Sequence, residues 1–516
     1  MPEDDPRITE LRAMRKKARQ AGGEDRIAKQ HAKGKLTARE RLDLLLDPGT
    51  FTELMPFAVQ QMDDLGVSDE KFFGDGVVTG YGRVDGRTVY VYAQDFTIQG
   101  GALGEMQSRK ICRTMDLAVA AGAPIIGLID SGGARIQEGV RSLGGYAEIF
   151  RRNALYSGVV PQISLILGPC AGGAAYSPAV TDLIIMVEKT SYMFLTGPEV
   201  IKSVTGEVID FEGLGGAAVH LGMSGTAHLT TQTEQDALAL ARRLLGYLPS
   251  NNVENPPFSK AADQPLSDES LNSHVPIDPS IAYNMHEIVE KVVDRGSFIE
   301  LFSTFACNAM IGFARIGGYA VGIVAQEPSV MAGVMDIDSA DKIARFVRLC
   351  DCYNLPLVTF IDSPGFLPGV DQEHRGIIRH GAKVLYAYSE ATVPKISIIT
   401  RKAYGGAYVV MSSKYMGTDL AYAWPSAEIA VMGPEGAANI LYRRQIESAE
   451  DPAAERARLV QEYRAQFLNP YAAAKAGYIE DVIEPAESRS RIISGLTALR
   501  DKHENLPVKK HGNMPV

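Results

Sequence analysis

The chain has 516 residues, of which 46% are hydrophobic and 22% charged, the composition of a globular protein large enough for two domains. Its formal net charge of −10 provides no long-range attraction to nucleic acid or to an anionic membrane, so neither is expected as a partner. Five cysteines form no CxxC pair and nine scattered histidines show no metal-binding spacing, so we expect no metal and a reducing compartment. The first residues lack the apolar segment of a secretory signal, which favours the cytoplasm.

Residues 1–70 are predicted to form a helical arm. The basic stretch from Arg12 to Arg41 is either a solvated helical face or a surface that contacts phosphate or a partner. Thr37 is followed three residues later by Glu40, which predicts a capping box at the start of a leucine-rich helix. The pair Asp47-Pro48 is expected to end that helix.

Residues 71–248 are predicted to form a first domain. Apolar runs at 88–93, 124–130 and 162–167 alternate with helical stretches such as 104–121, the pattern of βαβ units with buried parallel strands. The uncharged run 153–181 is long enough to cross a bilayer. Its prolines and glycines favour a buried strand, a loop and a helix start instead.

The chain contains this domain twice. Ala93-Gln94-Asp95 returns as Ala325-Gln326-Glu327, and Ile129-Asp130-Ser131 returns as Ile361-Asp362-Ser363, both 232 residues later. A proline-rich linker at 249–280 therefore leads to a second domain at 281–498 and a polar tail at 499–516. Even the entry segment is repeated, since 286–301 resembles 39–54.

Each domain carries a Gly-Gly turn between a predicted strand and a predicted helix. Gly172-Gly173-Ala174 matches Gly405-Gly406-Ala407. Adjacent glycines at such a turn either allow close helix–sheet packing or direct unpaired backbone N–H groups at an anion. The turns lack a phosphate-loop sequence, a nucleophile with its base, and an acid or base of their own. Two oxyanion holes of this kind suggest a reaction in which a cofactor supplies the base.

Several long strings, in order, resemble the carboxyltransferase (β) subunit of biotin-dependent acyl-CoA carboxylases of the propionyl-CoA carboxylase type. They are KGKLTARERL (33–42), DSGGARIQEG (130–139), AQEP (325–328), DSPGF (362–366), RKAYGGAY (401–408) and AWPSAEIA (423–430). The resemblance implies an α/β fold of two tandem crotonase-like domains, each a ββα superhelix. It also implies a hexamer, a trimer of dimers, that binds acyl-CoA on the first domain and carboxybiotin on the second.

The resemblance further implies roles for individual residues. The amides of Gly172 and Gly173 hold the thioester oxygen, and those of Gly406 and Ala407 hold the ureido oxygen of biotin. The other residues expected near the acyl-CoA are Gly132, Gly133, Ala134, Tyr408 and Val409, and those expected near biotin are Gly365, Phe366 and Gly405. The reaction implied moves CO₂ from carboxybiotin to propionyl-CoA or acetyl-CoA, giving methylmalonyl-CoA or malonyl-CoA.

The chain has no Met-Lys-Met biotinylation site and no ATP-binding loop, so a biotin carboxylase or biotin carboxyl carrier subunit is expected as partner. It also lacks the four-cysteine zinc ribbon of the separate acetyl-CoA carboxylase β chain. Val409 stands where propionyl-CoA carboxylases commonly carry Asp. The alternative function is the carboxyltransferase subunit of a sodium-pumping methylmalonyl-CoA decarboxylase, with a membrane partner. A non-enzymatic scaffold is disfavoured by the intact Gly-Gly pairs.

Overall fold

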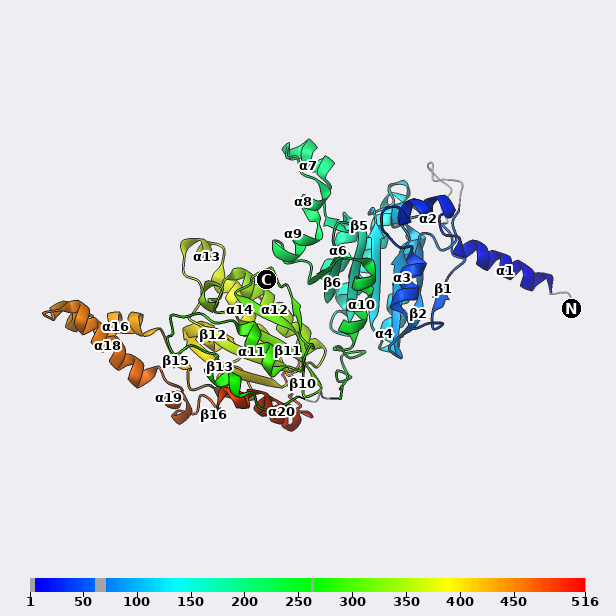
Figure 1. The fold of residues 1–516 in the computed structure, drawn as a ribbon. Coiled ribbons are helices and arrows are strands. Elements are labelled where there is room, and N and C mark those ends of the chain that lie inside the picture. Colours follow the sequence, from blue (N-terminus) through cyan, green and yellow to red (C-terminus); the bar gives the residue numbers. More distant parts are fainter. Residues whose placement is uncertain (1–4, 61–70, 261–263, 516) are drawn as a thin grey trace. The chain divides into compact units, whose positions relative to one another are not determined.

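The computed structural model describes residues 5–60, 71–260 and 264–515, and the chain divides into two compact units, Met1–Glu254 and Asn255–Val516. Each unit is built on one predominantly parallel sheet with helices around it (Figure 1). The strands β4 (Ile125–Ser131) and β12 (Leu357–Ser363) are buried at every position, as expected where both faces of a sheet are covered.

Unit 1 begins with the predicted helical segment. Its helices are α1 (Pro6–Arg19), α2 (Glu24–His31) and α3 (Ala38–Leu45). The capping box is confirmed, because the Thr37 hydroxyl accepts the Glu40 amide and the Glu40 carboxylate accepts the Thr37 amide at 2.7 Å. Leu42 and Leu45 of α3 are fully buried, so this helix is fixed to the body of the unit.

The sheet of unit 1 has the order β1-β2-β3-β4-β5-β6-β8, with β7 paired to the end of β5. Strands β1 to β3 form antiparallel pairs, whereas the strands from β3 onward are parallel. The remaining bounds are β1 (Thr52–Leu54), β2 (Val77–Val84), β3 (Arg87–Gln94), α4 (Glu105–Ala121), α5 (Val140–Tyr156), β5 (Gln162–Ala171), α6 (Gly173–Val180), β6 (Leu183–Val187), β7 (Tyr192–Phe194), α7 (Pro198–Thr205), α8 (Phe211–Gly215), α9 (Ala217–Gly222), β8 (Leu229–Thr231) and α10 (Glu234–Leu245).

Unit 2 repeats this topology, with the order β16-β14-β13-β12-β11-β10-β9 and β15 paired to the end of β13. It differs after β15, where four helices precede the last strand and α16, α17 and α18 pack on one another, whereas unit 1 has three helices between β7 and β8. The bounds are α11 (Met285–Val292), β9 (Ile299–Leu301), β10 (Ala309–Ile316), β11 (Tyr319–Gln326), α12 (Ile337–Cys352), α13 (Val370–His374), α14 (Ile377–Glu390), β13 (Lys395–Tyr404), α15 (Gly405–Val410), β14 (Leu420–Ala423), β15 (Glu428–Ala430), α16 (Pro434–Leu441), α17 (Arg443–Ser448), α18 (Pro452–Phe467), α19 (Pro470–Lys475), β16 (Asp481–Val482) and α20 (Ser488–Ala498).

The duplication extends to individual polar contacts. In each unit an aspartate after the entry helix accepts two amides from the turn of the strand hairpin and pairs with an arginine of the last helix. In unit 1 these are Asp47 with Asp85, Gly86 and Arg242, and in unit 2 they are Asp294 with Gly317, Gly318 and Arg489. In both units, therefore, an equivalent aspartate joins the hairpin turn to the last helix.

The uncharged run 153–181 forms the end of α5, then β5, the Gly-Gly turn and α6, as its prolines and glycines predicted. Across the described residues, no helix combines the length and the apolar character needed to span a bilayer.

Candidate active site

The Gly-Gly turn of unit 1 lies at the carboxyl end of β5. Gly172 has φ +59°, a left-handed conformation that glycine adopts readily, and its amide donates to the Phe194 carbonyl at 2.9 Å. Gly173 and Ala174 are the first two residues of α6, where a helix supplies no acceptor for its own N–H groups. The amides available to an external oxygen are therefore those of Gly173 and Ala174.

The Gly172 amide has a partner within the unit. The resemblance implies that this amide and that of Gly173 hold the thioester oxygen, and in the structure the Gly172 amide donates to the Phe194 carbonyl. Gly173 and Ala174 match Gly406 and Ala407 in the register of the repeat. Gly172 forms the left-handed turn that precedes these two amides.

The other predicted residues of unit 1 lie beside this turn. Because β4 and β5 are parallel, the segment Gly132–Gly133–Ala134 follows β4 at the same edge of the sheet. The Gly132 amide donates to the Gly100 carbonyl at 2.9 Å. Gly133 has φ +104°, and a Cβ there would lie 2.9 Å from the Ala171 carbonyl oxygen. The glycine thus allows the two turns to lie against each other.

A buried ionic cluster supports both turns from below. Asp130, near the end of β4, accepts Lys35 at 2.7 Å and pairs with Arg41 at 3.0 Å. Arg41 also donates to the Leu167 carbonyl of β5 and to Glu234 of α10. Lys35 and Arg41 both belong to the basic stretch, so part of that stretch has a structural role. Sequence spacing did not reveal this cluster, because its paired residues lie 89 to 193 positions apart.

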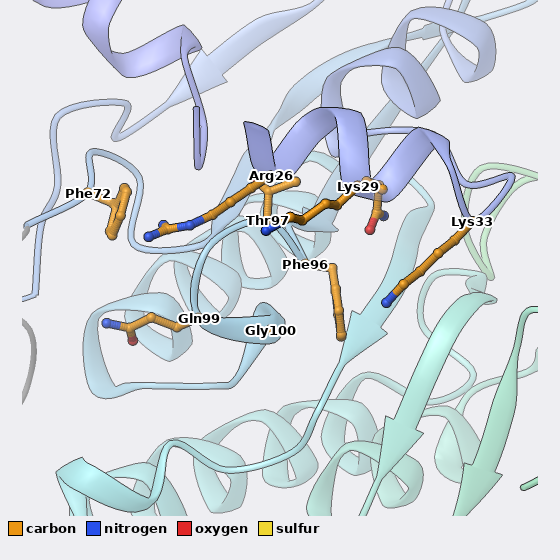
Figure 2. A pocket seen from close by; sticks show the side chains of 9 residues that line it. Arg26, Lys29, Lys33, Phe72, Phe96, Thr97, Gln99 and Gly100 are labelled. Carbon is orange, nitrogen blue, oxygen red and sulfur yellow. The ribbon is translucent and has the colours of Figure 1, made fainter. Parts of the chain in front are cut away.

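Three basic residues of the same stretch, Arg26, Lys29 and Lys33, line a cavity of about 370 Å³ (Figure 2). Lys33 and Lys35 lie 5.9 and 4.6 Å from the centre of the Phe96 ring. Three of the described lining residues are cationic and none is acidic, and the cavity reaches Gly100, which holds Gly132. The described lining residues are Arg26, Lys29, Gln30, Lys33, Phe72, Phe96, Thr97, Gln99 and Gly100.

The equivalent turn of unit 2 follows β13. Gly405 has φ +56°, and a Cβ there would lie 2.9 Å from the Val431 carbonyl oxygen. Gly406 is exposed and Ala407 buried, and both lie in the first turn of α15. A Cβ built on Gly406 would meet only the Phe366 ring among the described residues, at 3.8 Å, so the side-chain position of Gly406 is open.

The predicted residues Gly365 and Phe366 lie beside this turn. Gly365 has φ +147° and accepts the Met335 amide through its carbonyl, and the Phe366 ring covers Gly406. Burial raises the pKa of Tyr408 to about 12, so its hydroxyl is neutral at physiological pH. The neighbouring Val409 is 43% exposed and presents an apolar side chain at the end of the turn.

Two polar groups that the sequence did not indicate hold the second turn. Asp362 accepts Arg401 and the Lys402 amide, both at 3.0 Å, and burial raises the pKa of this carboxyl although Arg401 opposes the shift. The Tyr404 hydroxyl, immediately before Gly405, donates to Glu428, which also accepts Arg464 of α18. Unit 1 has Ala171 at the place of Tyr404, so this second support is specific to unit 2.

The site offers backbone donors rather than a protein nucleophile. Cys170 is the thiol closest in sequence to the first turn, but it is fully buried and burial raises its pKa. Within the described ranges, no group of three or more histidine, cysteine and carboxylate side chains is arranged to hold a metal ion. Each turn can therefore stabilise an oxygen that becomes negative during a reaction.

Comparisons with known proteins agree with this geometry. Residues 29–514 match the model of the carboxyl transferase domain. The chain is 58% identical to the propionyl-CoA carboxylase carboxyltransferase subunit of Haloferax mediterranei, with 99% of each chain covered. It is 54% identical to the methylmalonyl-CoA decarboxylase subunit alpha of Propionigenium modestum, again over 99% of each.

A crystal structure of transcarboxylase 12S, with methylmalonyl-coenzyme A and methylmalonic acid bound, superposes with a TM-score of 0.97 at 50% identity. It covers 99% of this chain and 98% of its own. The expected fold is confirmed: the two units are tandem crotonase-like domains. With a match over nearly its whole length and relatives above 50% identity, the chain belongs to the carboxyl transferase domain family.

Proposed function

We propose that this protein is the carboxyltransferase subunit of a biotin-dependent acyl-CoA carboxylase, acting on propionyl-CoA or acetyl-CoA. The observation that carries the proposal is the pair of equivalent glycine turns, one in each unit, whose helix-start amides have no acceptor within their own helix. The 58% identity to a propionyl-CoA carboxylase subunit supports the choice of substrate.

Each turn has one task in this proposal. The amides of Gly173 and Ala174 hold the thioester oxygen while it gains enolate charge, and those of Gly406 and Ala407 hold the ureido oxygen. Carboxybiotin, carried by a partner, supplies the CO₂ and the base for the α-proton. A side chain on Gly406 would have only the Phe366 ring near it, at 3.8 Å, so the glycine leaves room beside these amides for that oxygen. One oxyanion-hole donor is typically worth about 10²–10³ in rate, so the amides account for a large share of catalysis.

The cationic cavity of unit 1 suits the nucleotide end of coenzyme A. Arg26, Lys29 and Lys33 offer positive charge to its phosphates, and Phe96 offers an aromatic face to its adenine (Figure 2). Contact between Gly100 and Gly132 connects this cavity with the predicted acyl-CoA turn. We therefore assign the exposed part of the basic stretch to substrate binding.

The partners follow from the same proposal. The catalytic cycle needs a biotin carboxylase and a biotin carboxyl carrier, and we expect a hexamer like the hexamer assembly of transcarboxylase 12S. We place the protein in the cytoplasm, where propionyl-CoA and ATP are available.

A second candidate is the decarboxylase direction, favoured by 54% identity to the Propionigenium modestum subunit and by the apolar Val409. The chemistry at the two turns is the same in reverse. In that case another subunit must provide the passage through the membrane.

The test uses the purified chain with free biotin. In the absence of ATP, we expect biotin-dependent conversion of methylmalonyl-CoA to propionyl-CoA and of malonyl-CoA to acetyl-CoA. Chromatography of the CoA esters measures both conversions. The Val409→Asp variant serves as the specificity control and should change the ratio of the two rates. Turnover that does not depend on biotin contradicts the proposal.

A further inference from the structure

A second cavity, of about 270 Å³, lies in unit 2 at the opposite edge of the sheet from the Gly405–Gly406 turn. Pro356 and Pro394, which immediately precede β12 and β13, form its floor. β13 has ten residues, so at roughly 3.3 Å per residue its two ends are about 30 Å apart. The cavity is therefore separate from the proposed catalytic turn.

Unit 1 fills the equivalent place with its own chain. There α10 ends at Leu245, and the following residues cross the strand ends, where Asn251 donates to the Gly122 carbonyl at 2.9 Å and the Asn252 amide to Val159 at 3.0 Å. Arg87, at the start of β3, donates to the Leu245 carbonyl at 2.7 Å and fixes this segment.

In unit 2 the chain reaches the same strand ends differently, through Lys502 of the tail, which donates to the Val393 carbonyl at 3.2 Å. The repeat places Tyr319 where unit 1 has Arg87, and Asn354 and Thr392 where it has Gly122 and Val159. The last helix, α20, continues to Ala498, so the chain leaves the sheet edge later. The place closed by protein in one unit is open in the other, and the tail residues Arg500 to Glu504 form part of its rim.

The lining combines an aromatic wall with one unpaired cation. Phe258 and Tyr319 meet edge to face with ring centres 5.1 Å apart, and Phe258 is 61% exposed. Lys502 is neutralised by Asp419 at 3.0 Å and Glu504 at 3.3 Å. Arg500 makes no ion pair within the part of the chain that the structure describes.

These features select a ligand class. An aromatic wall favours a ring, and a free guanidinium favours a carboxylate that it can hold through two hydrogen bonds. Glu504 at the same rim would repel a second negative charge on the ligand. We propose that this cavity is a binding site for a small ring-bearing monocarboxylate, distinct from the acyl-CoA and biotin sites.

The test measures binding of three probes to the full chain by saturation-transfer NMR and calorimetry. The probes are 3-phenylpropionate, 3-phenylpropanol, which lacks the charge, and propionate, which lacks the ring. We expect one 3-phenylpropionate per chain, with the other two at least about tenfold weaker, the effect of losing one charge-assisted contact. Equal affinity for the ring alcohol, or no saturable binding of 3-phenylpropionate, overturns the proposal.

Two variants locate the site. Arg500→Gln should weaken 3-phenylpropionate about tenfold, and Tyr319→Arg, which introduces the residue of unit 1, should abolish its binding. Arg444→Gln, an exposed arginine of α17, is the matched control and should bind normally. Circular dichroism and thermal unfolding of all three variants should match those of the wild type, which shows that they fold and keeps the result independent of the proposed function. Unchanged binding in both Arg500→Gln and Tyr319→Arg rejects the site.

Discussion

The two glycines of the second turn are required for different reasons. Gly405 has φ +56° and only 2.9 Å between a built Cβ and the Val431 oxygen, so a side chain there strains the fold. Gly406 has an ordinary distance of 3.8 Å to Phe366, so a methyl group fits the protein but occupies the space in front of the amides. A substitution at Gly173 would separate packing from catalysis less well, because a Cβ there would lie 3.1 Å from the Tyr146 ring.

We therefore expect Gly406→Ala to lower kcat for biotin-dependent carboxyl transfer by about 10²-fold, because the methyl group keeps the ureido oxygen away from its donors. Its Tm should stay close to that of the wild type. Gly436→Ala, inside α16 and 3.7 Å from Met432, is the control and should retain activity. A stable Gly406→Ala protein with normal kcat returns this turn to a packing role.

His286 and Arg39 occupy the same place in the two units, and each pairs with a glutamate on the first strand, Glu300 and Glu53, at 2.9 Å. The side-chain hydrogen bond to Glu300 raises the pKa of His286 to about 9. The folded value lies above the ordinary value of 6.5, so this ion pair stabilises fully below pH 6.5 and its contribution disappears as the pH rises through 9.

Accordingly, His286→Gln should lower the Tm at pH 6 and have little effect at pH 10. Arg39→Gln should lower it at both, because the guanidinium does not titrate in this range. Thermal unfolding of the two variants and the wild type at both pH values provides the measurement. An equal loss for His286→Gln at pH 6 and pH 10 contradicts the pairing.

At the scale of elements, α2 and the loop after β3 form the cationic cavity. The double variant Lys29→Glu/Lys33→Glu should raise KM for methylmalonyl-CoA about tenfold or more and leave kcat nearly unchanged, because these residues bind ground state and transition state alike. The loss should shrink at high salt. Lys16→Glu on the exposed face of α1 is the control, and an equal rise in its KM would show a general charge effect.

Local patterns were predictable from sequence, and distant contacts were not. Thr37 and Glu40 lie three residues apart, so their capping box was visible in the sequence and is confirmed. The partners of Asp130 and the contact of Glu428 with Arg464 join residues far apart in the chain and leave no spacing signal. The repeat predicted both turns, but only the hydrogen bond of Gly172 to Phe194 revealed which amides are available.

At the scale of the whole molecule, the proposed function gives the chain two oxyanion sites, and its sequence has no Met-Lys-Met biotinylation site and no ATP-binding loop. We expect ATP-dependent carboxylation of propionyl-CoA only after a biotinylated partner with biotin carboxylase activity is added. Incorporation of ¹⁴C-bicarbonate into the acyl-CoA measures this reaction. A heat-inactivated partner is the control. Incorporation by the chain alone contradicts the assignment.

The buried ion pairs of each unit join residues that are synthesised far apart in time, so they affect when each unit can finish folding. Arg41 is fully buried and pairs with Glu234, which the ribosome adds 193 residues later, and Asp294 waits 195 residues for Arg489. Asp130 gives Arg41 one carboxylate early, but the second, Glu234, arrives only with α10, so the buried pairing of unit 1 is complete once α10 has emerged. All the partners of Arg41 belong to unit 1, so they are present while unit 2 is still being synthesised. The nascent chain thus completes its first unit before the second, nearly identical topology becomes available to mispair with it.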